Sequence, residues 1–184
     1  MRDAIGSTWI FSLVISFTLI FAGFLVLALS YSKAYKIKNE MTSIIEKYEG
    51  LTNNDILNGK GSIQIINQYL QNSGYRTKGN CEVGSYAADD LSLNSLVEVT
   101  STNNKQKYYY CISKSTISKN TISKNTISKN TNNCTTIFKI TVFYDFNLPV
   151  LGQLVKYSIS GQTNEIYGAY FLNQQINCLE DTSN

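Results

Sequence analysis

The sequence predicts an α+β protein in which a long N-terminal transmembrane-plus-amphipathic helix packs on a small antiparallel β-sheet. Three observations predict this class: a run without charged residues from Ala4 to Tyr31, apolar residues at helical spacing from there to Glu49, and alternating apolar residues after Tyr75. Of the 184 residues, those after the uncharged run are enough for one small domain and too few for two. We therefore expect one domain attached to one anchor.

The uncharged run is long enough to cross a bilayer as a helix, which takes about 20 apolar residues. It exceeds the apolar core of a secretory signal, about 7 to 15 residues, so we expect the segment to be retained; cleavage near Ala28-Leu29-Ser30 is the alternative. The expected boundaries are a flank at 1–8, a transmembrane part at 9–31, an amphipathic part at 32–49 and a domain at 50–184.

The helix is expected to continue beyond the membrane because apolar or small residues recur there every three or four positions. They are Ala34, Ile37, Met41, Ile44 and Tyr48. Gly50 is expected to end the helix, since it tolerates the left-handed conformation that closes one. Within the transmembrane part, small residues on roughly one face either admit a second helix or reflect ordinary anchor composition: Ser12, Ser16 and Gly23.

The domain is expected to begin with a short helix from Ser62 to Leu70, capped by Ser62 and ended by Gly74. The clearest strand is 138–146, where Phe, Ile, Val and Tyr alternate with other residues. Weaker strand patterns occupy 96–101, 107–112, 155–160 and 166–171. The apolar face of such a sheet and the stripe on the long helix can bury each other.

A tandem repeat lies between two of the expected strands. The unit Ile-Ser-Lys-Asn-Thr occurs at 117–121, 122–126 and 127–131, and 112–116 is an imperfect copy. Period five fits neither a helix nor a strand, so we expect a repeat-expanded loop at 113–133. The formal net charge of +3 equals the summed charge of three repeat lysines, Lys119, Lys124 and Lys129. The rest of the chain is therefore close to neutral, and nucleic-acid binding is not indicated. Weak contact of these lysines with acidic wall polymers is the functional alternative.

Four cysteines predict disulfides: Cys81, Cys111, Cys134 and Cys178. No CxxC occurs, which disfavours zinc and thioredoxin-like sites. Three connectivities are possible, and we expect Cys81–Cys111 with Cys134–Cys178 because each pair closes a loop within one part of the domain. Four free thiols in a cytosolic domain are the alternative.

Two signals disagree on orientation. Lysines after the apolar run favour a cytoplasmic domain by the positive-inside rule: Lys33, Lys36 and Lys38. The cysteines favour an extracytoplasmic domain instead. We give the cysteines more weight because a long polar domain can be translocated despite flanking charge. The expected location is therefore a cell membrane, crossed once, with the domain outside the cytoplasm.

Catalytic patterns are scarce in this sequence. It contains no histidine, which excludes a His-dependent triad and a His-based zinc site. Neither a phosphate-binding Gly-rich loop nor a nucleophile elbow occurs, and Asp89-Asp90 and Glu180-Asp181 suit solvated loops. We expect no enzyme, no cofactor and no metal. The apolar segment Leu148 to Gly152 either faces the bilayer or a neighbouring subunit, or folds into the core.

A family resemblance rests on the short leader with Gly6, the long N-terminal helix and the antiparallel sheet. The chain resembles the type IV pilin-like architecture and is most similar to TadE-like (Flp/Tad pilus assembly) pseudopilins of Gram-positive bacteria. The stretches that carry the resemblance are 1–11, 38–50, 146–152 and 160–163.

The resemblance implies a minor pilin or pseudopilin that is cleaved between Gly6 and Ser7 and assembles through its N-terminal helix with other pilin-like subunits. The family carries Glu at the fifth position after the cleavage-site Gly, and this chain has Phe11 there. A permanent anchor is therefore one alternative to an extracted filament subunit. A membrane-anchored surface-binding (adhesin-like) domain is the other.

Overall fold

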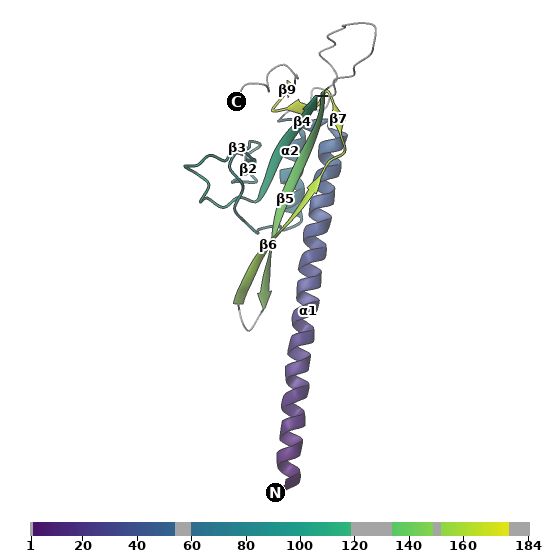
Figure 1. Ribbon diagram of the computed structural model, residues 1–184, viewed down its shortest axis with the longest axis vertical. Helices are drawn as coiled ribbons and strands as arrows, with labels where there is room; N and C mark the ends of the chain where they lie inside the picture. The colour runs from purple at the N-terminus through teal and green to yellow at the C-terminus, as the bar shows by residue number, and fades with distance from the viewer. Residues whose placement is uncertain (1, 54–59, 119–133, 149–151, 177–184) are drawn as a thin grey trace.

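The structure is a computed structural model that describes residues 2–53, 60–118, 134–148 and 152–176. Helix α1 (Arg2–Lys47) contains 46 residues and runs the length of the molecule (Figure 1). At 1.5 Å per residue it is about 70 Å long. The rest of the described chain gathers around its C-terminal half. The long continuous helix is therefore confirmed, and it ends close to the expected residue.

The residue that adopts the left-handed conformation at the end of α1 differs from the expectation. Glu49 adopts the left-handed conformation, with φ of 52°, and Gly50 follows with φ of 133°. A Cβ atom at Gly50 would lie 2.1 Å from the carbonyl oxygen of Tyr170. Gly50 is thus required because another backbone approaches it closely, not because it occupies the usual helix-closing conformation.

That close approach forms a small sheet beside the end of α1. Strand β1 (Gly50–Leu51) pairs in parallel with β8 (Tyr170–Phe171), which pairs antiparallel with β9 (Gln174–Gln175). The start and the end of the described domain are therefore joined at the C-terminal end of α1.

Helix α2 (Ser62–Asn72) confirms the expected short helix. Its end is as expected: Gly74 has φ of 66°, and the N–H of Tyr75 donates to the carbonyl of Leu70 at 3.0 Å, which closes a Schellman motif. Its start is not. Gly61 is the N-cap, while the Ser62 hydroxyl donates to the carbonyl of Gly50 at 2.8 Å. Ser62 therefore ties α2 to the chain that leaves α1 instead of capping α2.

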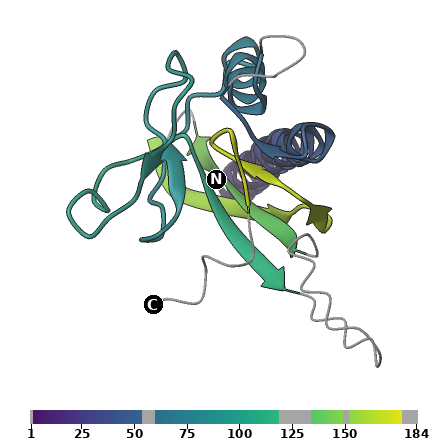
Figure 2. The same ribbon diagram turned by 90° about the horizontal axis from the view of Figure 1, so that it is seen from above.

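The main sheet has the order β3-β2-β4-β5-β6, with antiparallel pairing throughout that path. Its strands are β2 (Tyr86–Ala88), β3 (Val97–Glu98), β4 (Tyr110–Ser118), β5 (Cys134–Leu148) and β6 (Gly152–Gln162), and β7 (Ile166–Tyr167) also pairs with β5. Both helices lie on one face of this sheet (Figure 2). The α+β class is confirmed, and the alternating segment is the central strand β5.

The repeat loop begins later than expected. Strand β4 continues to Ser118, which pairs with Cys134 at the start of β5. The imperfect repeat copy and the first two residues of the next copy are therefore strand, and the expected loop boundary at 113 is wrong. Residues 119–133, with the remaining repeat units, lie outside the described residues.

The sheet separates two clusters of buried side chains, because neighbouring strand residues point to opposite faces. The larger cluster joins α1, α2 and β5, with Ile37, Met41, Ile45, Ile63, Ile66, Leu70, Phe138, Ile140 and Val142 among its members. The smaller cluster lies on the other face and contains Cys81, Ala87, Val99, Tyr108, Cys111 and Phe143. The stripe on α1 is thus covered by the domain, as the spacing predicts.

Candidate functional site

The N-terminal half of α1 is exposed and apolar. Trp9 is 71% exposed, Phe24 is 67% exposed, and most large apolar side chains between them are similar. Within the described chain, α1 is the one helix long and apolar enough to cross a membrane. An exposed apolar surface of this extent marks an interaction with a membrane or with another protein.

Small residues on this half lie in line with the face that the domain covers. Ser12, Ser16, Gly23 and Ala34 are separated by steps of four, seven and eleven residues, which return to one face of a helix. Ser12 and Ser16 are exposed, whereas Gly23 and Ala34 are buried. The expected small-residue face is therefore the continuation of the domain-packing face toward the N-terminus.

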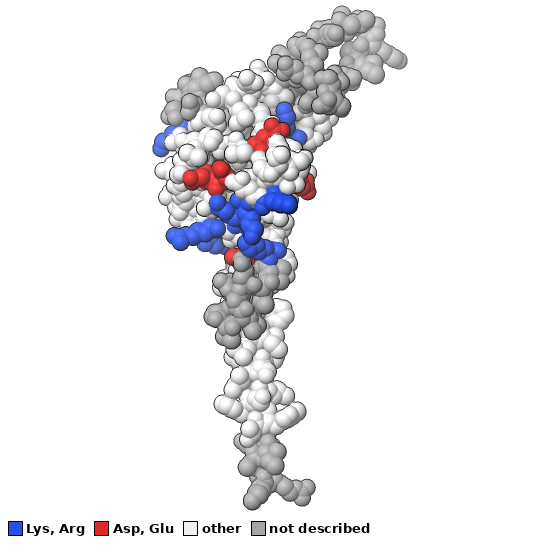
Figure 3. Space-filling model, turned by 90° about the vertical axis from the view of Figure 1, so that its left-hand side faces the viewer, with Lys and Arg blue, Asp and Glu red and all other residues white. Residues whose placement is uncertain are grey.

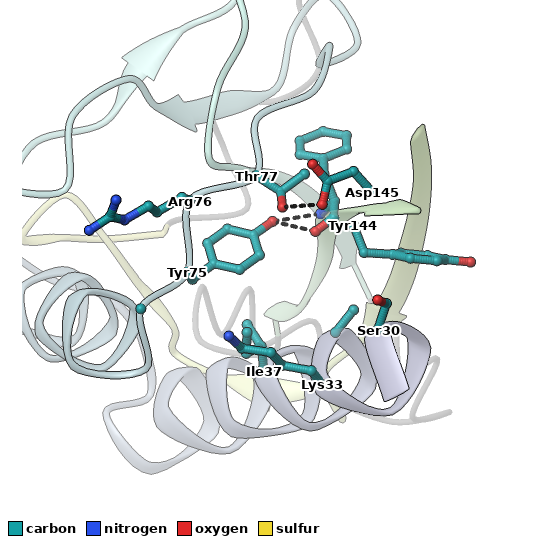
Figure 4. A pocket seen from close by; sticks show the side chains of 11 residues that line it. Ser30, Lys33, Ile37, Tyr75, Arg76, Thr77, Tyr144 and Asp145 are labelled. Atoms are coloured by element: carbon teal, nitrogen blue, oxygen red, sulfur yellow. Dashed lines mark hydrogen bonds between the residues drawn. The ribbon is translucent and has the colours of Figure 1, made fainter. Parts of the chain in front are cut away.

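The edge of the domain nearest the apolar half of α1, around Ser30, Tyr75 and Asp145, is called the base of the domain below. It meets α1 where the apolar half ends. A pocket of about 330 Å³ lies there, between α1, the segment after α2 and strand β5 (Figure 4). Its polar lining includes Ser30 and Lys33 from α1, Tyr75, Arg76 and Thr77 from the segment after α2, and Asp145 from β5. In Figure 4 the side chain of Lys33 extends toward the segment that carries Tyr75.

Tyr75 completes the sheet at this point. The first residue of β4, Tyr110, pairs with Val142, so the backbone of Phe143 lies beyond the end of β4. The Tyr75 hydroxyl lies 2.7 Å from the Phe143 carbonyl oxygen and accepts from the Phe143 N–H at 2.8 Å. Both backbone groups are thereby satisfied. Burial raises the pKa of Tyr75 far above its ordinary value of 10.0, so the hydroxyl stays protonated and structural.

Cations gather around the same base. Lys156 on β6 stands opposite Asp145 in the β5–β6 register, and its Nζ donates to the carbonyl of Lys78 at 3.4 Å. The Nζ of Lys78 donates to the carbonyl of Asp89 at 2.8 Å. Figure 3 shows Lys and Arg side chains in a band along the lower edge of the domain, just above the exposed half of α1.

Tyrosine rings form a second group at the base. The Tyr31 ring contacts those of Tyr35 and Tyr144, with centroids 6.4 and 6.1 Å apart. Tyr144 stacks on Tyr157 of β6 at 5.3 Å. These four residues, Tyr31, Tyr35, Tyr144 and Tyr157, are called the tyrosine cluster below.

The predicted disulfide between Cys81 and Cys111 is confirmed, with the two sulfur atoms 1.98 Å apart. It belongs to the smaller buried cluster, on the sheet face away from α1. The predicted Cys134–Cys178 bridge is not described, because Cys178 and the Cys134 side chain lie outside the described residues. Among the described residues, no group of three His, Cys, Asp or Glu side chains could hold a metal ion.

The other predicted sites are placed only in part. Gly6 and Ser7 belong to α1, but their side chains are not described. Lys119, Lys124 and Lys129 lie outside the described residues, as does the centre of the apolar segment 148–152. On either side of that segment, β5 and β6 reach further toward the N-terminal half of α1 than the other strands do (Figure 1).

Sequence reasoning missed the pocket and the tyrosine cluster. Their residues come from segments that are far apart in the chain, such as Ser30, Arg76 and Asp145. The sequence signal closest to them was Gly74, which ends α2 and thereby directs Tyr75 toward β5.

Comparisons of the chain with protein-family models, with curated proteins and with solved structures find no match.

Proposed function

We propose that this protein is a non-enzymatic, single-pass membrane subunit that assembles through the N-terminal half of α1 with other pilin-like subunits. One observation carries the proposal: a single unbroken helix is exposed and apolar in its first half and is the packing centre of the domain in its second half. The exposed half needs a cover of lipid or of other helices.

The continuity of α1 favours assembly over simple attachment. An anchor needs only about 20 apolar residues and can be joined to its domain by any linker. Here the helix enters the core without a break, with Ile37, Met41 and Ile45 buried against the domain. The position of the domain is therefore fixed relative to the apolar half, which is what a subunit packed by its helix requires. The small face with Ser12 and Ser16 permits close approach of another helix.

The proposed location is a bacterial cell membrane with the domain on its extracytoplasmic side. The Cys81–Cys111 disulfide supports this side, because disulfides persist in oxidising compartments and are rare in the cytosol. Cleavage between Gly6 and Ser7 is part of the proposal. Intact-mass measurement of the membrane-extracted protein tests it: a mature chain that begins at Ser7 is expected, and a chain that begins at Met1 would leave a permanent anchor.

Assembly is tested by photo-crosslinking in cells with a benzophenone amino acid in place of Phe17 or Phe24, both on the exposed half of α1. We expect protein–protein adducts from these positions. The matched control is Tyr167, which is exposed on the domain, and it should give none of the same adducts. If the helix positions give lipid adducts alone, the protein acts singly, as a membrane-anchored surface-binding domain would.

A further inference from the structure

We propose that the base of the domain is a docking surface for the membrane surface, where the tyrosine cluster lies among lipid headgroups and nearby cations bind anionic headgroup phosphates. The cations are Lys33, Arg76, Lys78 and Lys156. This inference goes beyond assembly, and it applies while α1 crosses the bilayer, whether or not the subunit is later extracted.

The length of the exposed helix sets the level of the base. From Trp9 to Tyr31, the bounds of the expected transmembrane part, α1 rises about 33 Å, close to the thickness of the hydrocarbon core of a bilayer, about 30 Å. Ser30 and Lys33 both line the pocket. The pocket therefore lies where the helix leaves the hydrocarbon and enters the headgroup layer.

The tyrosine cluster independently indicates the same level. Tyrosine is enriched at membrane–water interfaces because its ring is apolar and its hydroxyl is polar. Tyr31 and Tyr35 follow the apolar half of α1 directly, and β5 and β6 bring Tyr144 and Tyr157 beside them. Tyr31 is 48% exposed and Tyr157 is 43% exposed, so part of each ring is available to lipid.

The charge of the base fits anionic headgroups. Its cations come from separate segments: Lys33 from α1, Arg76 and Lys78 from the chain after α2, and Lys156 from β6. Asp145 is the only acid that lines the pocket among the described residues, and it accepts from the Thr77 hydroxyl and stands opposite Lys156. Arg and Lys side chains bind phosphate oxygens by charge-assisted hydrogen bonds, and basic segments beside a transmembrane helix attract anionic lipid.

The partner is a lipid surface and not a soluble polyanion, because the apolar half of α1 projects from the same edge of the domain. Once that half is in a bilayer, the base faces the bilayer at close range. Cations elsewhere, such as Lys47 near the far end of α1, are held away from the membrane by the length of the helix.

The test uses the full chain reconstituted in phosphatidylcholine vesicles that contain trace spin-labelled phosphatidylglycerol or spin-labelled phosphatidylcholine. Electron paramagnetic resonance measures the immobilised fraction of each label. We expect the native chain to prefer phosphatidylglycerol. The variant Lys33→Gln/Arg76→Gln removes two exposed cations of the pocket and should lower that preference by about fivefold or more.

The matched control is Lys47→Gln/Lys60→Gln, which removes the same charge from exposed positions near the far end of α1. It should keep the native preference. Equal preferences for both labels in the native chain would overturn the proposal, as would an equal loss in the two double variants, which would reduce the effect to net charge. Circular dichroism of each variant establishes that the fold is retained. Cross-links from Phe17 test assembly separately, so either proposal can fail without the other.

Discussion

The two halves of α1 have apolar residues in different arrangements and are covered by different surroundings. In the first half, apolar side chains occupy every face and remain exposed, as Ile20 does at 60%. In the second half they occupy one stripe, and Ile45 on that stripe is completely buried by the domain. The comparison shows that one continuous helix can carry two arrangements of apolar side chains. The arrangement changes from all faces to one stripe near Ser30.

The largest expected effect comes from making the same substitution in each half. Ile45→Ala should lower the free energy of unfolding of the domain by about 4 kcal/mol, because it leaves a cavity in a packed core. Ile20→Ala should leave the domain within about 0.5 kcal/mol of the native chain. Denaturant unfolding of both variants in detergent micelles measures the difference. Similar losses would show that the two halves are not independent.

The disulfide tests whether the far face of the sheet supports α1. Replacing Cys81 and Cys111 by Ala removes a cross-link between residues 30 positions apart and should cost about 3 kcal/mol. Because the bond belongs to the smaller cluster, hydrogen exchange should rise most around β2 and β4. An equal rise along the buried stripe of α1 would contradict the separation of the two clusters.

Substitutions at two glycines separate the effect of a close backbone contact from the effect of backbone conformation alone. Gly50→Ala should cost about 3 kcal/mol, since its Cβ would collide with the Tyr170 carbonyl and the φ of 133° is unfavourable for Ala. Gly74→Ala should cost about 1 kcal/mol, because its φ is 66° but no atom lies within 4 Å. Thermal unfolding of the two variants gives the ranking. Equal shifts would exclude the role assigned to the contact with β8.

The effect that is smallest near neutral pH concerns two buried tyrosines and appears only at alkaline pH. Burial raises the pKa values of Tyr75 and Tyr110 above their ordinary value of 10.0. Above that pH the unfolded chain releases these protons while the folded chain retains them, so stability should fall with pH. Between pH 10 and the raised pKa, each tyrosine should lower the free energy of unfolding by about 1.4 kcal/mol per pH unit. Well below pH 10, neither tyrosine should make the free energy of unfolding depend on pH.

Denaturant midpoints across the alkaline range measure this slope. Tyr75→Phe and Tyr110→Phe should each flatten it, because Phe has no proton to release. A slope that is unchanged in both variants would show that other groups cause the loss of stability.

Elements with strong local patterns could be predicted from the sequence. The spacing from Ala34 to Tyr48 predicts the buried face of α1, and alternation predicts β5. The full extent of β4 could not be predicted, because its second half reads as part of a polar repeat and is strand through pairing with β5. The base of the domain could not be predicted either. Tyr75 is 68 residues from Phe143, and the topology alone brings them together.

The pairing of Ser118 with Cys134 has a consequence for how this chain can change. The described chain stops within the repeats at Ser118 and resumes after them at Cys134, and these two residues pair across neighbouring strands. Copies of the five-residue unit can therefore be gained or lost between these residues without a shift in the register of β4 and β5. Doubling the length of such an insertion costs only about 0.6 kcal/mol in closure entropy. Replication slippage at the repeat would thus produce length variants that share one core.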